Sequence, residues 1–78
     1  MNKDITLDCY GIMCPMPIIK TKKQMGQMQI GQVLEVLATD EGIIKDMPAW
    51  CAMTGQEYLG LEREGDVIRV YVKKVKNT

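Results

Sequence analysis

The chain has 78 residues, of which 46% are hydrophobic and 26% are charged, and its ten basic and ten acidic residues give a net charge of zero. A chain of this length supports one modest hydrophobic core, so we expect residues 1–78 to form one domain, without a separate cofactor-binding half. The balanced charge argues against a dedicated nucleic-acid-binding protein. The sequence contains no His, which excludes catalytic triads, Cys–His pairs and zinc sites that need an imidazole.

The first half of the chain predicts two strands separated by a helix. Ile5, Leu7 and Cys9 alternate with polar residues, as in a half-buried strand. Apolar side chains at helical spacing predict a helix over about 15–28, with lysines and glutamines on its other face. The nearly continuous apolar run over 33–38 is typical of a central strand.

A second helical segment follows the central strand. Asp40 is the expected N-cap residue, and Gly55 the expected end of the helix. Because Pro48 should break or kink a helix, we expect a short turn near 41–45 and a helix over about 47–54.

Two more strands, over 56–64 and 67–73, are predicted as a hairpin that turns at Gly65 and Asp66. The last residues, 75–78, are expected to be a frayed tail. The order strand, helix, strand, helix, strand, strand predicts an α/β two-layer sandwich. Its mixed four-stranded sheet should carry both helices on one face.

Cys14 is the main candidate for chemistry, because it lies where the first loop becomes the first helix. Pro15 is expected at the first helical position, which places Cys14 at or near the N-cap. With Pro17 also lacking an N–H, few backbone donors remain in the first turn. A helix N-terminus favours an anion and should lower the pKa of a thiol there by up to about one unit. The alternative is that Cys14 is only a small capping residue.

The sequence around this cysteine resembles the TusA/SirA-type sulfur carrier family. Leu7-Asp8 followed by Gly11-Ile12-Met13-Cys14-Pro15-Met16-Pro17 looks like the family signature, as does the later segment over 46–51. The similarity extends over about residues 5–74. It implies the fold of the C-terminal domain of translation initiation factor 3. The best-known branch has Glu between the prolines and often a basic residue before the cysteine, so Met16 and Met13 make this site more apolar.

The resemblance implies that Cys14 carries sulfane sulfur as a persulfide. The implied partners are a sulfur donor, such as a cysteine desulfurase or a rhodanese-like protein, and a sulfur acceptor protein. The implied pathways are tRNA thiolation, cofactor assembly or other sulfur trafficking. Such a protein is a sulfur-transfer carrier rather than a stand-alone enzyme of many turnovers. We expect it to be a monomer without a cofactor.

Several other residues have both a structural and a functional interpretation. Cys9 either ends the first strand as a core residue, the interpretation we favour, or serves as a resolving thiol for Cys14. Cys51 is expected in the core. The sequence has no Cys-x-x-Cys pair, and it predicts no metal site. Lys22 and Lys23, with Lys20, form a basic cluster that is either a solvated helix face or a docking patch for an acidic partner.

The residues beside the thiol are interpreted in the same way. Gly11 should permit the turn that exposes Cys14. Met13 and Met16 are either an adaptable contact surface or simply exposed side chains. Asp8 should fix the loop, and Lys73, Lys74 and Lys76 should be a solubilising tail.

Two other functions remain alternatives at this point. A thiol redox switch would need both Cys9 and Cys14. A non-catalytic module that binds RNA or a protein partner would need neither thiol. The chain has no apolar stretch of membrane-spanning length, and it begins without the apolar core of a signal peptide. We therefore expect a cytoplasmic protein without stable nucleic-acid or membrane binding.

Overall fold

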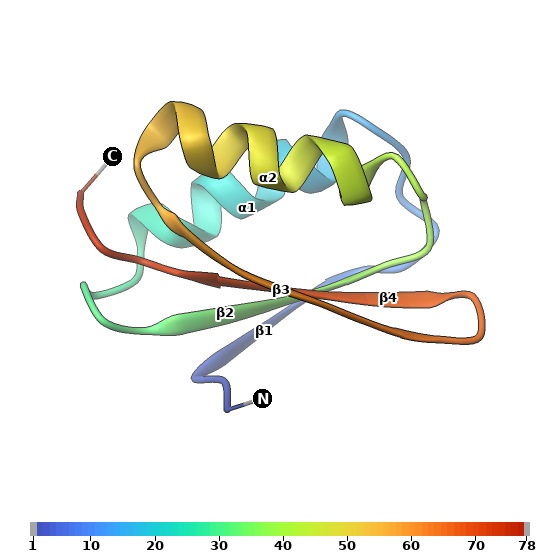
Figure 1. Ribbon diagram of the computed structural model, residues 1–78, viewed down its shortest axis with the longest axis horizontal. Coiled ribbons are helices and arrows are strands. Elements are labelled where there is room, and N and C mark those ends of the chain that lie inside the picture. The colour runs from blue at the N-terminus through green and yellow to red at the C-terminus, as the bar shows by residue number, and fades with distance from the viewer. Residues whose placement is uncertain (1, 78) are drawn as a thin grey trace.

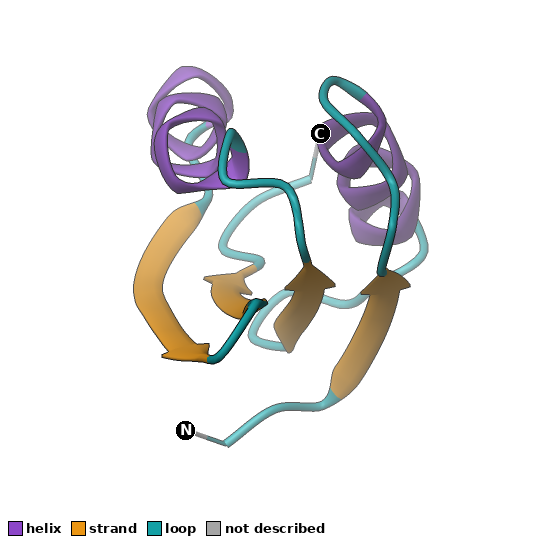
Figure 2. Ribbon diagram, turned by 90° about the vertical axis from the view of Figure 1, so that its right-hand side faces the viewer, coloured by secondary structure: helices purple, strands orange, loops and turns teal. Residues whose placement is uncertain are grey.

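A computed structural model of the protein describes residues 2–77 and shows a two-layer α/β sandwich (Figures 1 and 2). The elements in chain order are β1 (Ile5–Cys9), α1 (Met16–Gly26), β2 (Val33–Ala38), α2 (Ile43–Thr54), β3 (Glu57–Glu64) and β4 (Val67–Lys73). Both helices cover the same face of the sheet (Figure 2). The predicted fold class is confirmed.

The sheet is mixed, with strand order β1-β2-β4-β3. β1 pairs parallel to β2, because α1 returns the chain to the same edge of the sheet before β2 begins. β4 lies antiparallel to both β2 and β3, and the predicted hairpin joins β3 to β4. The topology sends the ends of β1 and β2 toward the same edge, so the loops that follow them are neighbours (Figure 2).

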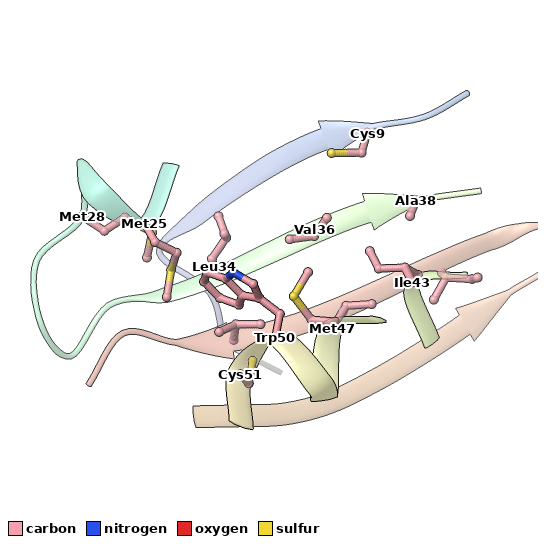
Figure 3. Packing of buried hydrophobic residues seen from close by; sticks show 13 residues of the cluster. Cys9, Met25, Met28, Leu34, Val36, Ala38, Ile43, Met47, Trp50 and Cys51 are labelled. Carbon is pink, nitrogen blue, oxygen red and sulfur yellow. The ribbon is translucent and has the colours of Figure 1, made fainter. Parts of the chain in front are cut away.

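The core lies between the helices and the covered face of the sheet (Figure 3). Its largest fully buried side chains include Met25, Leu34 and Met47, with Trp50 only 5% exposed. Three methionines, Met25, Met28 and Met47, are buried in this core, and the chain contains no phenylalanine. Cys9 and Cys51 belong to the same cluster.

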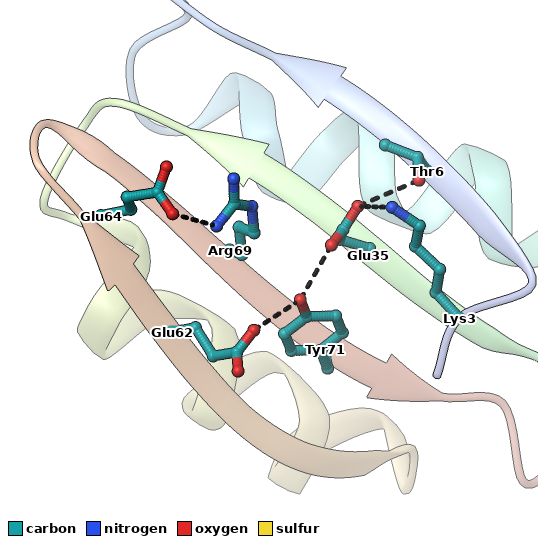
Figure 4. A network of polar contacts seen from close by, with 7 residues as sticks. All are labelled: Lys3, Thr6, Glu35, Glu62, Glu64, Arg69 and Tyr71. Atoms are coloured by element: carbon teal, nitrogen blue, oxygen red, sulfur yellow. Dashed lines mark hydrogen bonds and ion pairs between the residues drawn. The ribbon is translucent and has the colours of Figure 1, made fainter. Parts of the chain in front are cut away.

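The open face of the sheet holds a polar network that the sequence did not reveal (Figure 4). Glu35 on β2 is 4% exposed and accepts hydrogen bonds from Lys3, Thr6 and Tyr71. Tyr71 on β4 is 2% exposed, and its hydroxyl also lies 2.9 Å from a carboxylate oxygen of Glu62. Burial opposes ionisation of Glu35, but the hydrogen bonds from Lys3, Tyr71 and Thr6 outweigh it, so its pKa is lowered.

The second helix differs from the prediction. α2 is continuous from Ile43 to Thr54, so the expected turn is confined to residues 41–42, and the helix begins four residues earlier than predicted. Pro48 removes one backbone N–H from the helix, but it does not end the helix, because Ile43 and Met47 on the preceding turn pack into the core. The helix still ends at Gly55, which has a φ of 81°.

The segment after β4 is also more ordered than expected. Lys74 is 3% exposed, and its ammonium donates to the carbonyl oxygens of Met25 and Met28 at the end of α1. Gln56 binds the backbone of Val75 and the carbonyl of Lys76. The predicted frayed tail is therefore wrong for Val75 and Lys76, because their backbone is paired with Gln56; Thr78 lies outside the described residues. The expectation that Lys74 belongs to a solubilising tail is also wrong, because its side chain is buried. Lys76 remains exposed.

Candidate functional site

The candidate site lies in the loop between β1 and α1. Gly11 has a φ of 71°, which only glycine adopts without strain, and its N–H donates to the hydroxyl of Thr39 after β2. Asp8 accepts the N–H of Tyr10 at 2.9 Å, so the expectation that Asp8 fixes the loop is confirmed. The bond between Gly11 and Thr39 holds the β1–α1 loop against the β2–α2 loop.

Cys14 is exposed, whereas Cys9 and Cys51 are buried. The helix begins one residue later than predicted: Pro15 is the N-cap, and Met16 is the first helical residue. Cys14 thus precedes the N-cap. The predicted helix over 15–28 is otherwise α1, which ends at Gly26 rather than at residue 28.

Two carboxylates hold Cys14 from the neighbouring segment. Asp40, in the loop after β2, accepts the N–H of Cys14 at 2.7 Å through one oxygen and the N–H of Gly42 at 3.1 Å through the other. The N-cap of α2 is Gly42 rather than Asp40. Asp46, in the first turn of α2, accepts a hydrogen bond from the thiol, with its Oδ2 2.9 Å from Sγ. The loop, the thiol and the start of α2 therefore form one unit.

The charges and hydrogen bonds around Cys14 contradict the prediction that the pKa of its thiol is lowered. The hydrogen bond to Asp46, partial desolvation, and the charges of Asp46 and Asp40 all raise the pKa of Cys14. The hydrogen bonds from the backbone of Cys14 and Gly42 lower the pKa of Asp40, so its carboxylate is ionised at neutral pH. The predicted lowering of the Cys14 pKa is wrong.

The backbone of α1 explains why the helix N-terminus does not stabilise a thiolate. The N–H of Met16 donates to the carbonyl of Met13, and the N–H groups of Ile18 and Ile19 donate to the carbonyl of Pro15. Pro17 has no N–H to offer. The donors of the first turn are thus already paired with carbonyl oxygens, and the sulfur is paired with a carboxylate instead.

A shallow apolar groove of about 370 Å³ lies beside the thiol, between α1 and α2. Its walls include Ile18 from α1 and Ala49, Trp50 and Met53 from α2. Met53 is 78% exposed, so most of its side chain is accessible to solvent. Cys14 and Asp46 also line this groove, so a molecule that reaches the sulfur also touches apolar surface.

The remaining candidate residues divide into exposed and buried ones. Met13 and Met16 are exposed, at 74% and 43%. Lys22 and Lys23 are exposed on α1. Cys9 has no exposed surface, which confirms its favoured interpretation as a core residue, and Cys51, at 2% exposed, is confirmed in the core.

The sequence alone does not reveal Asp40 and Asp46 as site residues. It predicts Asp40 only as a helix cap, and it places Asp46 only within a segment that resembles the family. Asp46 lies 32 positions from Cys14, so its contact with the thiol depends on the packing of α2. Among residues 2–77, no cluster of three or more metal-ligating side chains is present, and no helix is long and apolar enough to cross a membrane.

The fold and the site together define a small α/β domain that presents one exposed cysteine at the start of its first helix. Residues 5–74 match the family model of the sulfurtransferase TusA. The chain belongs to this family.

Proteins that are similar in sequence or in structure support this assignment to the family. The sulfur carrier protein TusA of Allochromatium vinosum is 42% identical over 71 residues, which cover 91% of this chain and 93% of that protein. YrkF of Bacillus subtilis is 50% identical over 74 residues, but these cover 95% of this chain and only 40% of YrkF. The crystal structure of a SirA-like protein of Desulfitobacterium hafniense has a TM-score of 0.81 and 27% identity, and it covers 94% of this chain and 100% of that one.

Proposed function

We propose that the protein carries sulfur as a persulfide on Cys14 and transfers it to an acceptor thiol. The observation that carries this proposal is the exposure of Cys14, while Cys9 and Cys51 are buried. Membership of the TusA family and the likeness to the sulfur carrier of A. vinosum support it. A carrier needs an accessible sulfur on a stable scaffold, and it needs no deep pocket.

Loading is an exchange between two sulfur atoms. The sulfur of Cys14 attacks the outer sulfur of a donor persulfide, a new S–S bond forms, and the donor leaves as a thiolate with the electron pair of the broken bond. The proton of the Cys14 thiol passes to the departing donor thiolate, through Asp46 or water. No electrons are gained or lost overall, so loading needs no oxidant.

Because the pKa of Cys14 is raised, the rate of loading depends on the donor that docks beside it. An ordinary thiol is mostly protonated at neutral pH, and the hydrogen bond to Asp46 and the charges of Asp46 and Asp40 raise the pKa of Cys14 further. A donor that brings a positive group beside these two carboxylates lowers the pKa of the thiol while it is docked. Loading is therefore faster within a complex than with a neutral small donor.

The surface around Cys14 suits contact with partner proteins. The exposed side chains of Met13 and Met16 and the groove beside the thiol offer adaptable apolar contacts. Lys22 and Lys23 on α1 add positive charge that attracts an acidic partner. We assign these four residues to docking of the donor, of the cysteine desulfurase or rhodanese-like class, and of the acceptor. Free cysteines and persulfide chemistry suit the reducing cytoplasm, where we place the protein.

A redox switch between Cys9 and Cys14 has no support in the structure. Cys9 is fully buried, and burial raises the pKa of its thiol. A disulfide with Cys14 would require Cys9 to leave the core.

Intact mass spectrometry tests the proposal. The reduced protein is incubated anaerobically with glutathione persulfide, and the mass is compared before and after treatment with a reductant. We expect a reversible gain of one sulfur atom that is absent in Cys14→Ser. The buried-cysteine variants Cys9→Ala and Cys51→Ala are the matched controls and should gain the sulfur. A gain that persists in Cys14→Ser, or no gain at all, contradicts the proposal.

A further inference from the structure

Asp46 accepts a hydrogen that exists only while Cys14 is a free thiol. Its Oδ2 lies 2.9 Å from Sγ, and the thiol is the donor. When Sγ is bonded to a second sulfur atom, it has no hydrogen to donate, and the bond to Asp46 is lost. This contact therefore stabilises the empty carrier and gives nothing to the loaded one.

The negative charge of the persulfide also favours the empty carrier over the loaded one. A persulfide is a stronger acid than the corresponding thiol, so its outer sulfur is negatively charged at neutral pH. That sulfur is only about 2 Å from Sγ, and it remains close to the carboxylates of Asp46 and Asp40. Like charges at this separation repel each other. Asp40 is bound to two backbone N–H groups, so it holds the loop together in both states. Asp46 is bound to the sulfur itself, and its interaction changes on loading.

We propose that Asp46 biases the carrier toward releasing its sulfur, because it stabilises the free thiol of Cys14 and opposes the persulfide anion. This inference rests on the proposed function. On delivery, an acceptor thiolate attacks the outer sulfur, and the electron pair of the broken S–S bond returns to Sγ. Sγ then takes a proton from water and restores its hydrogen bond to Asp46. The carrier is thereby prevented from binding sulfur so tightly that it fails to transfer it.

The direct test is the equilibrium distribution of sulfur between Cys14 and glutathione. The protein is incubated anaerobically with glutathione persulfide and glutathione at fixed ratios, and the loaded fraction is measured by intact mass spectrometry. Asp46→Asn removes the negative charge and keeps the shape of the side chain. We expect the equilibrium constant for loading to rise roughly threefold to tenfold, the effect of losing one charge-assisted contact at an exposed site.

The matched control is Glu64→Gln, which removes the same charge from the sheet face opposite the helices (Figure 4). Glu64 contacts only Arg69 among the charged side chains drawn there, at 3.4 Å, and its variant should load like the wild type. Asp46→Ser is a second neutral variant, with a shorter side chain than Asp46→Asn. It is used alongside Asp46→Asn, and circular dichroism verifies that each variant is folded.

The outcomes separate this inference from the proposed function. If the wild type loads on Cys14 and both neutral variants hold sulfur more tightly than Glu64→Gln does, the inference is supported. If the wild type loads and the variants show an unchanged or smaller equilibrium constant, the inference is overturned and the proposed function stands. If the wild type takes up no sulfur on Cys14, both are overturned.

Discussion

The thiol of Cys14 donates a hydrogen bond to the carboxylate of Asp46 across 2.9 Å, and the two residues are 32 positions apart in the chain. The contact joins the loop before α1 to the first turn of α2. It also determines the resting state of the sulfur, because a neighbouring carboxylate favours the neutral thiol over the thiolate.

The pH dependence of alkylation should reveal this resting state. The pKa of Cys14 is raised by Asp46 and Asp40, so its reaction with iodoacetamide should reach half of its maximal rate above the ordinary thiol value of about 8.5. In Asp46→Asn the midpoint should move to lower pH. Peptide mass spectrometry over a pH series measures the rate at Cys14 alone. A wild-type midpoint below the ordinary value would contradict the effect of the two carboxylates.

The polar network on the open face of the sheet should contribute to stability. Tyr71→Phe removes the hydroxyl that contacts Glu35 and Glu62, and it should lower the free energy of unfolding by about 1–3 kcal/mol. Tyr10→Phe changes an exposed tyrosine and is the matched control. Urea unfolding followed by circular dichroism compares the two. Equal stability of the two variants would show that the network contributes nothing.

Glu35 should also make stability depend on pH at the acidic end. Its pKa is lowered in the folded state, so ionised Glu35 stabilises the fold fully above the ordinary glutamate value of about 4.3. This contribution is lost as the pH falls through the lowered folded-state pKa. Glu35→Gln should therefore lose less stability than the wild type between neutral pH and pH values below about 4. Parallel pH profiles for the two proteins would show that Glu35 is not the group responsible.

Lys74 should act as a cap for α1. Lys74→Met keeps the apolar stem but removes the ammonium that binds the carbonyls of Met25 and Met28, so it should cost about 1–3 kcal/mol of unfolding free energy. Lys73→Met, at a neighbouring half-buried lysine, should cost less. Thermal unfolding compares the two, and a larger loss at Lys73 would argue against the cap.

The lysines of α1 should affect loading only when the donor is a protein. Replacing Lys22 and Lys23 by Glu should slow loading from a rhodanese-like donor by roughly tenfold at low salt, with a smaller effect as salt is added. Loading from glutathione persulfide should not change. The double variant Lys73→Glu/Lys76→Glu makes the same change in net charge around the end of β4, which lies beside the start of β2 and not beside the loops that follow β1 and β2, and it controls for net charge. Equal slowing with both donors would mean that the lysines act on the thiol and not on docking.

Local patterns were sufficient to predict the order of elements and the core positions of Cys9 and Cys51. Alternation and helical spacing depend on which side of an element is buried, and this is visible in a short window of sequence. Local patterns wrongly predict that Pro48 breaks the second helix. The helix continues because the packing of Ile43 and Met47 outweighs one lost hydrogen bond.

The electrostatics of the site could not be read from the sequence. The position of Cys14 before a helix predicted a stabilised thiolate, but the N–H groups of the first turn are paired within the backbone. The partners of the thiol and of its N–H come from the β2–α2 segment, and only the fold brings them together. Lys74 was misinterpreted for a similar reason, since its charge is satisfied by carbonyls at the end of a distant helix.

The most direct test of the account is a single-turnover transfer of sulfur from the loaded protein. The protein is loaded with isotopically labelled sulfur, freed of donor, and mixed with an equimolar amount of reduced glutathione, which supplies one acceptor cysteine. The account predicts that the labelled sulfur leaves Cys14 and appears on the acceptor cysteine, with one sulfur lost for each one gained. Label that remains on the carrier, or that is released as sulfide without reaching the acceptor, would contradict the assignment of Cys14 as the carrier of transferable sulfur.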